Sequence, residues 1–414
     1  MPRATGQAED AAARPGLYLH IPFCSAICPY CDFAVLTGGP ERRAAFVESL
    51  TAEIGLWRGE AARWGSFDTV YFGGGTPSAL TAGEIGRLLE AARAALPVAA
   101  DAWIAFEANP EDVDRERLAA WRGLGVGMLS LGVQSFDAPT LRFLGRRHSP
   151  EQARRSVEQA LESGLTVSVD LIYGIEGIDR GDRSDGSGRA AGGEAGDDGI
   201  RHGRWRRDLE TAAALSPHHL SCYQLTVHQG TPFGFRAARG ELGELPEADQ
   251  AELFRFTHTF LAGRGYAGYE VSNFARAPEH RSRHNRKYWD HTPYLGLGPS
   301  AHSFDGSRRW WNERKLPAYQ ARLAAGLRPI AGEELLAAGE LALEELMLAL
   351  RTAAGLDLDG FRRRHGIDLL ERNRARLGQL QAEGLLVERG GRLVPTLDGL
   401  AVTDSLARAL DLGT

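Results

Sequence analysis

The stretch LYLHIPFCSAICPYC, residues 17–31, decides the fold and raises the main chemical question of this 414-residue chain. Its first six residues form the pattern of a short buried strand. Cys24, Cys28 and Cys31 follow at once in the spacing C-x3-C-x2-C, and the remaining cysteine, Cys222, lies far along the chain. Three clustered thiols are an odd number for disulfides and one fewer than a closed tetrahedral metal site needs.

Three cysteine ligands suit an iron–sulfur cluster better than zinc. A zinc site normally adds a fourth Cys or His with a short spacing of its own, and His20, inside the predicted strand, offers no such pair. Three thiolates on a 4Fe-4S cluster leave one iron without a protein ligand, and that iron can bind a small molecule. We therefore expect Cys24, Cys28 and Cys31 to hold a 4Fe-4S cluster.

Short apolar strands alternate with helical patterns along the first two thirds of the chain. This alternation predicts a parallel sheet with right-handed crossovers, and hence an α/β fold. Six units are too few for a closed eight-fold barrel, so we expect a partial (β/α)6 barrel, with a doubly wound sheet as the alternative. In either fold the functional residues gather at the carboxyl ends of the strands. The predicted strands are LYLHIP (17–22), FDTVYF (67–72), AWIAFE (102–107), MLSLGV (128–133), LTVSVDLIYG (165–174) and HLSCYQLT (219–226).

Changes in composition predict the domain boundaries. Residues 1–15 are expected to be a disordered tail and residues 16–275 the barrel, in which the Gly-, Asp- and Arg-rich residues 177–204 form a disordered insertion. Residues 276–330 are then a connecting segment. Residues 331–414 show two long helical patterns, a hairpin and a last helix, an order that resembles a mostly α winged-helix domain. The many acidic residues of this domain disfavour DNA binding.

Further candidate site residues lie at or just beyond the ends of the predicted strands. In the motif GGGTPS, the glycines let the backbone come close to a ligand at Gly74, Gly75 and Thr76, although the lysine of a phosphate loop is absent and a plain tight turn is the alternative. Glu107 ends the third strand, where a carboxylate can accept hydrogen bonds from ribose hydroxyls. Asp170 lies within an apolar strand and must be paired or functional, because burying a bare carboxylate is costly.

Together these motifs resemble the radical S-adenosylmethionine (SAM) family, in the branch of the oxygen-independent coproporphyrinogen III oxidases and the haem chaperones. HIPFC with the cysteine spacing, GGGTPS, E-x-NP, G-x-QSF, GR-x-H and D-x-IYG occur in order, and the resemblance covers about residues 17–410 apart from the insertion. It implies that the open iron of the cluster binds SAM. The positions that it assigns to SAM are Tyr18, Gly74, Gly75, Thr76, Glu107, Gln134, Arg146 and Asp170.

Two features favour the haem chaperones within this branch. The oxidases have a further cysteine two places after the third cluster ligand, where this chain has Phe33. The segment HNRKYW matches the H-N-x-x-Y-W motif of the chaperones: His284 offers an imidazole to haem iron, and Tyr288 and Trp289 offer flat faces to a porphyrin. Judged from the residues alone, the segment is as well explained by a packed aromatic corner. His302 is a second candidate ligand.

The resemblance implies a haem chaperone that binds a 4Fe-4S cluster, SAM and haem and passes haem to an acceptor protein, whose identity the sequence leaves open. The alternative function within porphyrin biosynthesis is an anaerobic coproporphyrinogen III decarboxylase that uses a SAM-derived radical, against which Phe33 argues. Whether SAM is cleaved, and hence whether the protein is an enzyme, stays open.

Two positions depart from the usual pattern of the branch. Ile175 and Glu176 stand where Leu-Pro is expected, which leaves the shape of the loop after the fifth strand in doubt. His228 stands where an acidic residue is usual, and this puts a substrate-side contact in doubt.

The overall composition indicates a cytoplasmic protein. The formal net charge is −6 and the pI about 6.1, so nucleic acid is not an expected partner. Four cysteines do not make a disulfide framework, and no apolar run approaches the ~20 residues of a membrane span. A peripheral contact with a membrane stays open.

Overall fold

The computed structural model describes residues 13–175 and 203–413. Most of the predicted tail and insertion therefore lies outside the described residues. At their edges the boundaries were wrong by a few residues. Arg14 and Pro15, assigned to the tail, contact the barrel: the Arg14 guanidinium lies 3.7 Å from Asp68, and the Pro15 carbonyl accepts a bond from the Asp68 N–H. Gly203, assigned to the insertion, already begins a helix.

Six parallel strands form the barrel, and they lie side by side in chain order from β1 to β6. A doubly wound sheet would reverse its strand order at a switch point, so the partial barrel is confirmed. β1 pairs with β9 on its other side and β6 pairs with β8, which leaves the barrel open. The barrel strands are β1 Gly16–Ile21, β2 Phe67–Gly74, β3 Val98–Ala108, β4 Val126–Gln134, β5 Thr166–Tyr173 and β6 His219–Gln224.

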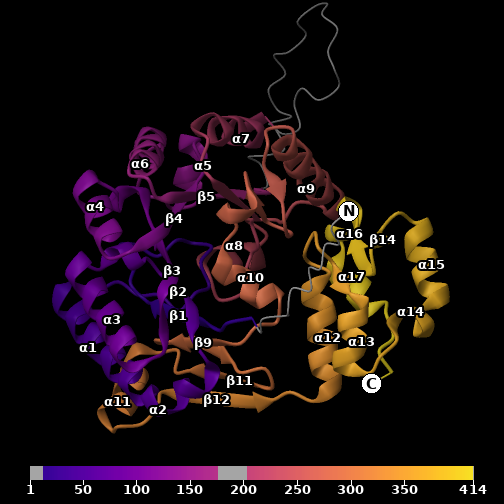
Figure 1. The fold of residues 1–414 in the computed structure, drawn as a ribbon. Helices are drawn as coiled ribbons and strands as arrows, with labels where there is room; N and C mark the ends of the chain where they lie inside the picture. Colours follow the sequence, from indigo (N-terminus) through magenta and orange to yellow (C-terminus); the bar gives the residue numbers. More distant parts are fainter. Residues whose placement is uncertain (1–12, 176–202, 414) are drawn as a thin grey trace, which may run out of the picture.

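Helices cover the outer side of the sheet (Figure 1). Thr81 and Glu84 form a capping box at the start of α3, and Ser149 caps α6, in which Pro150 is the first residue. The helices between the strands are α1 Pro40–Leu56, α2 Arg58–Ala61, α3 Ala82–Ala95, α4 Arg115–Gly123, α5 Ala138–Phe143, α6 Pro150–Glu162, α7 Gly203–Leu215, α8 Pro232–Ala238 and α9 Glu247–Ala262. Short 3-10 turns are η1 Ala62–Trp64, η2 Pro77–Ala79, η3 Pro110–Asp112 and η4 Pro278–His280.

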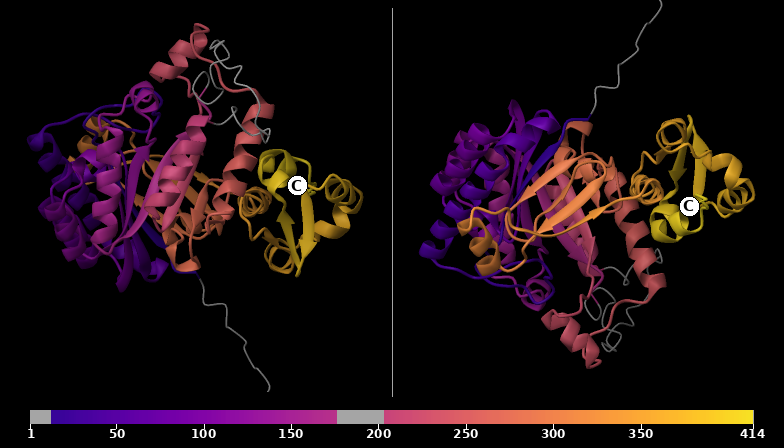
Figure 2. Two further views of the ribbon diagram at one scale, coloured as in Figure 1. Left: turned by 90° about the horizontal axis from the view of Figure 1, so that it is seen from above. Right: turned by 90° about the horizontal axis from the view of Figure 1, so that it is seen from below.

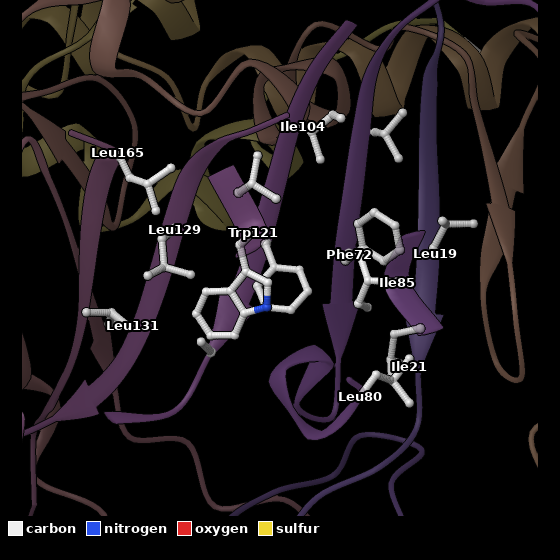
Figure 3. Close-up of a cluster of buried hydrophobic side chains, with 14 of the residues drawn as sticks. Leu19, Ile21, Phe72, Leu80, Ile85, Ile104, Trp121, Leu129, Leu131 and Leu165 are labelled. Carbon is white, nitrogen blue, oxygen red and sulfur yellow. The ribbon is translucent and has the colours of Figure 1, made fainter. Parts of the chain in front are cut away.

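The two faces of each barrel strand differ in chemistry, because neighbouring side chains on a strand point to opposite sides. Leu19, Phe72 and Leu129 are fully buried and pack outward with Ile85 and Trp121 of the helices (Figure 3). The alternate positions face inward, and many of them are polar. This polar interior positions the candidate site. Its members include Tyr18, His20, Thr69, Tyr71, Glu107, Ser130, Ser168, Asp170, His219, Ser221 and Tyr223.

Residues 276–330 are more than the connecting segment that the sequence predicted. They carry a helix, α10, that contacts β2, and three strands that extend the sheet beyond β1. The next strand, β12, pairs with β11, so the sheet continues past residue 330 and the predicted boundary at 331 is too early. Between residues 267 and 335 the elements, apart from the 3-10 turn η4, are β7 Ala267–Gly268, β8 Asn273–Ala275, α10 Arg283–Trp289, β9 Tyr294–Leu297, β10 His302–Phe304, β11 Arg308–Asn312, α11 Leu316–Ala324 and β12 Ile330–Leu335.

The C-terminal domain has its own apolar core and stands beside the barrel (Figure 2). It is mostly helical with a small three-stranded sheet, as predicted, and Gly390 and Gly391 make the expected hairpin turn at positive φ. The long helix predicted over residues 369–386 is broken at Asn373. The elements are α12 Ala338–Ala349, β13 Leu356–Asp357, α13 Leu358–His365, α14 Leu369–Arg372, α15 Arg374–Ala382, β14 Leu386–Arg389, β15 Arg392–Pro395, α16 Leu397–Leu400 and α17 Thr403–Arg408.

One buried carboxylate joins the first barrel helix to the segment around β9–β11. Glu53 on α1 is fully buried and accepts three hydrogen bonds, from the Gly298 N–H at 2.7 Å, Asn312 Nδ2 at 2.6 Å and the Tyr319 hydroxyl at 2.6 Å. Burial raises the pKa of Glu53 to about 7.

Among the described helices, none combines the length and the apolar character that crossing a bilayer requires.

Candidate SAM and iron–sulfur site

One pocket of about 470 Å³, at the carboxyl ends of the barrel strands, brings the predicted site residues together. All three clustered cysteines line it. Seven of the eight positions that the resemblance assigned to SAM also line it: Gly74, Gly75, Thr76, Glu107, Gln134, Arg146 and Asp170. Segments from four strands and three loops therefore converge on one space, as expected for a barrel of this type.

The cysteine loop follows β1 and is held by main-chain bonds. The Cys24 N–H donates to the Leu36 carbonyl at 3.0 Å, and the Cys31 N–H donates to the Cys28 carbonyl at 3.1 Å. The three thiols are partly exposed and free. In the described ranges, no three His, Cys, Asp or Glu side chains stand close enough for a single metal ion. Burial raises the pKa of Cys24 to about 11, so binding of iron must displace its proton.

The amide groups of the glycine loop between β2 and η2 are hydrogen-bonded within the protein. The Gly75 N–H donates to the Ile21 carbonyl at 2.8 Å, and the Thr76 N–H donates to the Phe23 carbonyl at 2.7 Å. The Gly74 N–H donates to a carboxylate oxygen of the pocket at 3.1 Å. These three amides are therefore already paired within the protein, which disfavours a phosphate held by this loop.

Close packing explains why this loop contains glycines. Gly74 has a φ of 111°, and a Cβ on it would lie 2.6 Å from the ring of His20. A Cβ on Gly75 would lie 2.7 Å from the Phe23 carbonyl oxygen. Neither position has room for a side chain, so the loop can lie against the end of β1, next to the first cysteine.

Two carboxyl groups from neighbouring layers of the barrel face the pocket. Glu107 accepts hydrogen bonds from the Tyr71 hydroxyl at 2.8 Å and from the Gly74 N–H. Burial, with a smaller contribution from Asp170, raises the pKa of Glu107 to about 7. Asp170 accepts from the Ser130 hydroxyl at 3.0 Å, and burial raises its pKa to about 6. A ligand that brings hydroxyl donors and a positive charge would favour the anionic form of both.

Arg146 links the cysteine loop to the ends of β3 and β4. Its Nη2 donates to Asn109 Oδ1 at 2.6 Å and to the Gly132 carbonyl at 2.8 Å, and its Nη1 lies 3.4 Å from the Sγ of Cys28. Its Nε is buried without a hydrogen-bond partner. An unpaired guanidinium N–H beside a thiol fits an anionic group bound next to the cluster, such as the carboxylate of SAM.

Some pocket residues were missed from the sequence. Asn109 links the two sides of the site, because its Nδ2 also donates to Thr76 Oγ1 at 3.2 Å, and it was visible as the asparagine of the E-x-NP motif. Ser130 and Tyr223 line the pocket from inward positions of β4 and β6, which the two-residue period of those strands could have indicated. Gln134 was predicted, and its φ of 66° places it in a strained conformation where β4 ends.

Tyr18 is the position that the structure does not bring into the pocket. It points into the barrel interior, where its hydroxyl lies 3.2 Å from His20 Nδ1. Its ring stacks on Tyr71 and on His284, with centroids 6.1 Å and 6.2 Å apart. Tyr18 therefore does not line the pocket of the cysteines, and its contact with SAM stays a prediction. His20 Nε2 lies 3.1 Å from the Ala34 carbonyl, so this imidazole belongs to the loop and is no metal ligand.

The HNRKYW segment forms α10, which closes the amino end of the barrel. His284 is fully buried. Its Nδ1 lies 2.9 Å from Thr69 Oγ1 and its Nε2 lies 3.0 Å from the Tyr288 hydroxyl. The Nζ of Lys287 on this helix lies 2.6 Å from Oδ1 of Asp68 on β2, and this ion pair holds the helix against the strand. Burial lowers the pKa of His284 to about 3, so the imidazole is neutral, but neither nitrogen is free to bind iron in this conformation.

The other candidate haem residues are more accessible. Tyr288 and Trp289 are half-buried, and Trp289 Nε1 has no hydrogen-bond partner. His302 is exposed on β10, and its ring stacks on that of Trp311 with centroids 5.9 Å apart.

Phe33, which stands where the oxidases have a cysteine, lines the cluster pocket and is 63% exposed.

The two departures from the branch pattern lie beside this pocket. His228 lines it, and its Nδ1 lies 3.5 Å from Asp32. Ile175 is fully buried in a small apolar cluster with Leu144 and Phe233, so the end of β5 is packed there. Glu176 lies outside the described residues.

Comparison with known proteins agrees with this geometry. Residues 18–185 match the radical SAM superfamily, and residues 336–402 match the HemN C-terminal domain. The chain is 37% identical over 404 residues to the heme chaperone HemW of Mycobacterium tuberculosis, covering 95% of this chain and 94% of that protein. It is 36% identical to the heme chaperone HemW of Escherichia coli over 69% of each chain.

A solved structure shares the fold over nearly the full length. The coproporphyrinogen III oxidase HemN of E. coli, a radical SAM enzyme, superposes with a TM-score of 0.77 at 22% identity, over 96% of this chain and 90% of that one. At that identity the likeness concerns the fold alone. The cysteine loop, the glycine loop and the match in sequence along the chain lead to one conclusion: the chain belongs to the radical SAM family, in the branch of the HemW proteins.

Proposed function

We propose that this protein is a haem chaperone that binds a 4Fe-4S cluster, SAM and haem and delivers haem to an acceptor protein. The observation that carries the proposal is the match in sequence, over 95% of the chain, to a relative named a heme chaperone. The geometry supports the cofactor part, because the three cysteines and the polar residues expected for SAM line one pocket.

The proposed roles follow from the contacts. Cys24, Cys28 and Cys31 hold the cluster, whose open iron binds the amino and carboxylate groups of SAM. Arg146 has an unpaired N–H for the carboxylate. Glu107 accepts from the ribose hydroxyls. When bound, the cluster would supply an electron that can split SAM.

Binding of haem by His284 requires a movement of α10. The imidazole is buried, and both of its nitrogens are engaged. Haem iron must therefore replace Tyr288 or Thr69 as the partner of one nitrogen. The half-buried rings of Tyr288 and Trp289 lie on the same short helix and would move with it to meet the porphyrin. His302, which is already exposed, is the alternative ligand.

The proposed location is the cytoplasm, where thiols stay reduced. The acceptor protein is unidentified. The second candidate function is a coproporphyrinogen III decarboxylase, which rests on the shared fold alone, whereas Phe33 stands where a cysteine of the oxidases is expected.

The test is a haem titration into anaerobically reconstituted protein, followed by the Soret band, with His284→Ala and His302→Ala in parallel. We expect saturation near one haem per chain and a loss or shift of the band in His284→Ala only. Loss in His302→Ala instead would move the ligand to β10. No saturable binding, together with decarboxylation of coproporphyrinogen III under reducing conditions, would reject the chaperone function in favour of the oxidase.

A further inference from the structure

Two cavities lie one above the other inside the barrel and share a wall. The upper one is the cluster and SAM pocket. The lower one has a volume of about 40 Å³, room for a few water molecules. Ser282 and Asn285, at the start of α10, line the lower cavity. The residues that line both cavities are Glu107, Ser130, Asp170 and Tyr223. These four residues therefore form the wall between the expected SAM site and the small cavity that the start of the expected haem helix lines.

Tyr71 is the side chain that contacts both sides of this layer. Its hydroxyl donates to Glu107 Oε1 at 2.8 Å. Its ring stacks on the imidazole of His284, with centroids 5.2 Å apart and planes inclined by 26°. Tyr18 also stacks on His284, but its hydroxyl pairs with His20 instead. Of these two tyrosines, only Tyr71 joins the carboxylate of Glu107 to the imidazole of His284.

We propose that Tyr71 is a positioning residue that couples the two sites: SAM in the upper pocket holds Tyr71 on Glu107 and thereby keeps His284 in its buried place. SAM and haem then oppose each other. Binding of SAM disfavours the movement of α10 that haem needs, and binding of haem weakens the hold on SAM by the same factor. The inference rests on the proposed function for the identity of the second ligand.

The direction of the coupling follows from the chemistry of Glu107. Hydroxyl donors and the positive sulfonium of SAM favour the carboxylate form of Glu107. A hydrogen bond from the Tyr71 hydroxyl to an ionised carboxylate is stronger than one to a neutral carboxyl group. The tyrosine ring is then held more firmly against His284, whose removal from the barrel would also leave Thr69 without its partner.

The length of the path explains why a relay is needed. Thr69, at the level of the imidazole, and Gly74, at the level of the pocket, lie five residues apart on β2, which is about 16 Å along a strand. No single ligand group can touch both levels. The stacked pair of Tyr71 and His284 spans the gap between them.

The first measurement needs no haem. Hydrogen exchange of the peptide containing residues 283–289 is compared with and without SAM in the anaerobically reconstituted protein. We expect SAM to slow exchange in α10 of the wild-type protein. We expect Tyr71→Phe, which keeps the ring and loses only the hydroxyl, to remove this effect. The control Tyr266→Phe, which loses a buried hydroxyl that donates to the Pro217 carbonyl and not to Glu107, should keep it.

The second measurement is a haemin titration with and without saturating SAM. SAM should weaken haemin binding by a factor within the usual range of about 5 to 150, and Tyr71→Phe should bring this factor close to one. If Tyr71→Phe does not fold, Thr69→Val replaces it. This variant removes the Nδ1 partner of His284, so it should speed exchange in α10 and tighten haemin binding without SAM; unchanged values would refute the coupling.

Failure of the coupling and failure of the proposed function give different results. Exchange in α10 that does not respond to SAM in the wild-type protein overturns the coupling, whatever haemin does. An equal response in Tyr71→Phe and wild-type protein overturns the role of Tyr71. Haemin that fails to bind in every condition overturns the chaperone function, while the exchange experiment still decides whether SAM holds α10 in place.

Discussion

Replacing Arg146 by lysine should weaken SAM binding without loss of the cluster. The guanidinium donates to Asn109 Oδ1 and to the Gly132 carbonyl from one nitrogen and keeps a second, unpaired N–H at Nε. A lysine keeps the charge but has a single nitrogen on a flexible stem, so it cannot support Asn109 and meet a ligand carboxylate in the same geometry. Loss of one charge-assisted hydrogen bond costs about 1.5–3 kcal/mol, which corresponds to roughly a 10- to 150-fold higher Kd.

The assay is equilibrium dialysis of SAM against anaerobically reconstituted protein, with iron and sulfide measured on the same samples. Arg147→Lys is the matched control, because Arg147 is the exposed neighbour of the same type. About four iron per chain should remain in both variants, since the cysteines are untouched. SAM affinity in Arg146→Lys equal to that of the control would refute the role given to the guanidinium, and loss of iron would show that Arg146 supports the cluster instead.

Three further predictions concern stability and the glycine loop. Glu53→Ala leaves three buried donors without an acceptor, and urea titration should show a free energy of unfolding lower by about 3–5 kcal/mol. Because the pKa of Glu107 is about 7 when folded and near its ordinary value of 4.5 when unfolded, the folded state holds a proton that the unfolded state has lost between these pH values. The free energy of unfolding of the apoprotein should therefore fall as pH rises through this window, by up to about 3 kcal/mol from this group, and Glu107→Gln should remove that part of the slope. Gly74→Ala must push against the His20 ring and should lower both cluster content and SAM binding, whereas Gly83→Ala, on an open helix surface, should leave both unchanged.

The barrel could be predicted well because short stretches of sequence specify its strands and the starts of its helices. Each predicted strand overlaps an observed one, and short local signals such as the caps at Thr81 and Ser149 mark where helices begin. The pocket could also be predicted, because the carboxyl ends of parallel strands meet on one side of the sheet. Residues as far apart as Cys24 and Asp170 therefore line the same space.

What could not be predicted depends on contacts between distant segments. Nothing near His284 in the chain indicates that Thr69 would take its Nδ1, 215 positions away. The same holds for Tyr18: motif position placed it beside SAM, but the two-residue period of β1 turns its ring toward α10. The strands β9–β12 were missed because their pairing continues a sheet that is defined by the first half of the chain.

The carboxylate of Glu53 also bears on how the protein is made. Its donor Gly298 lies 245 positions downstream, and Tyr319 follows 266 positions downstream. At a synthesis rate of about 5–20 residues per second, the ribosome delivers these donors roughly 12–50 seconds after the glutamate. During that interval α1 carries a polar group on the surface that will become its buried face, and β1 lacks its neighbour β9. The nascent barrel therefore keeps an unpaired strand edge until late in translation, and this edge is where we expect chaperone binding or aggregation during expression to begin.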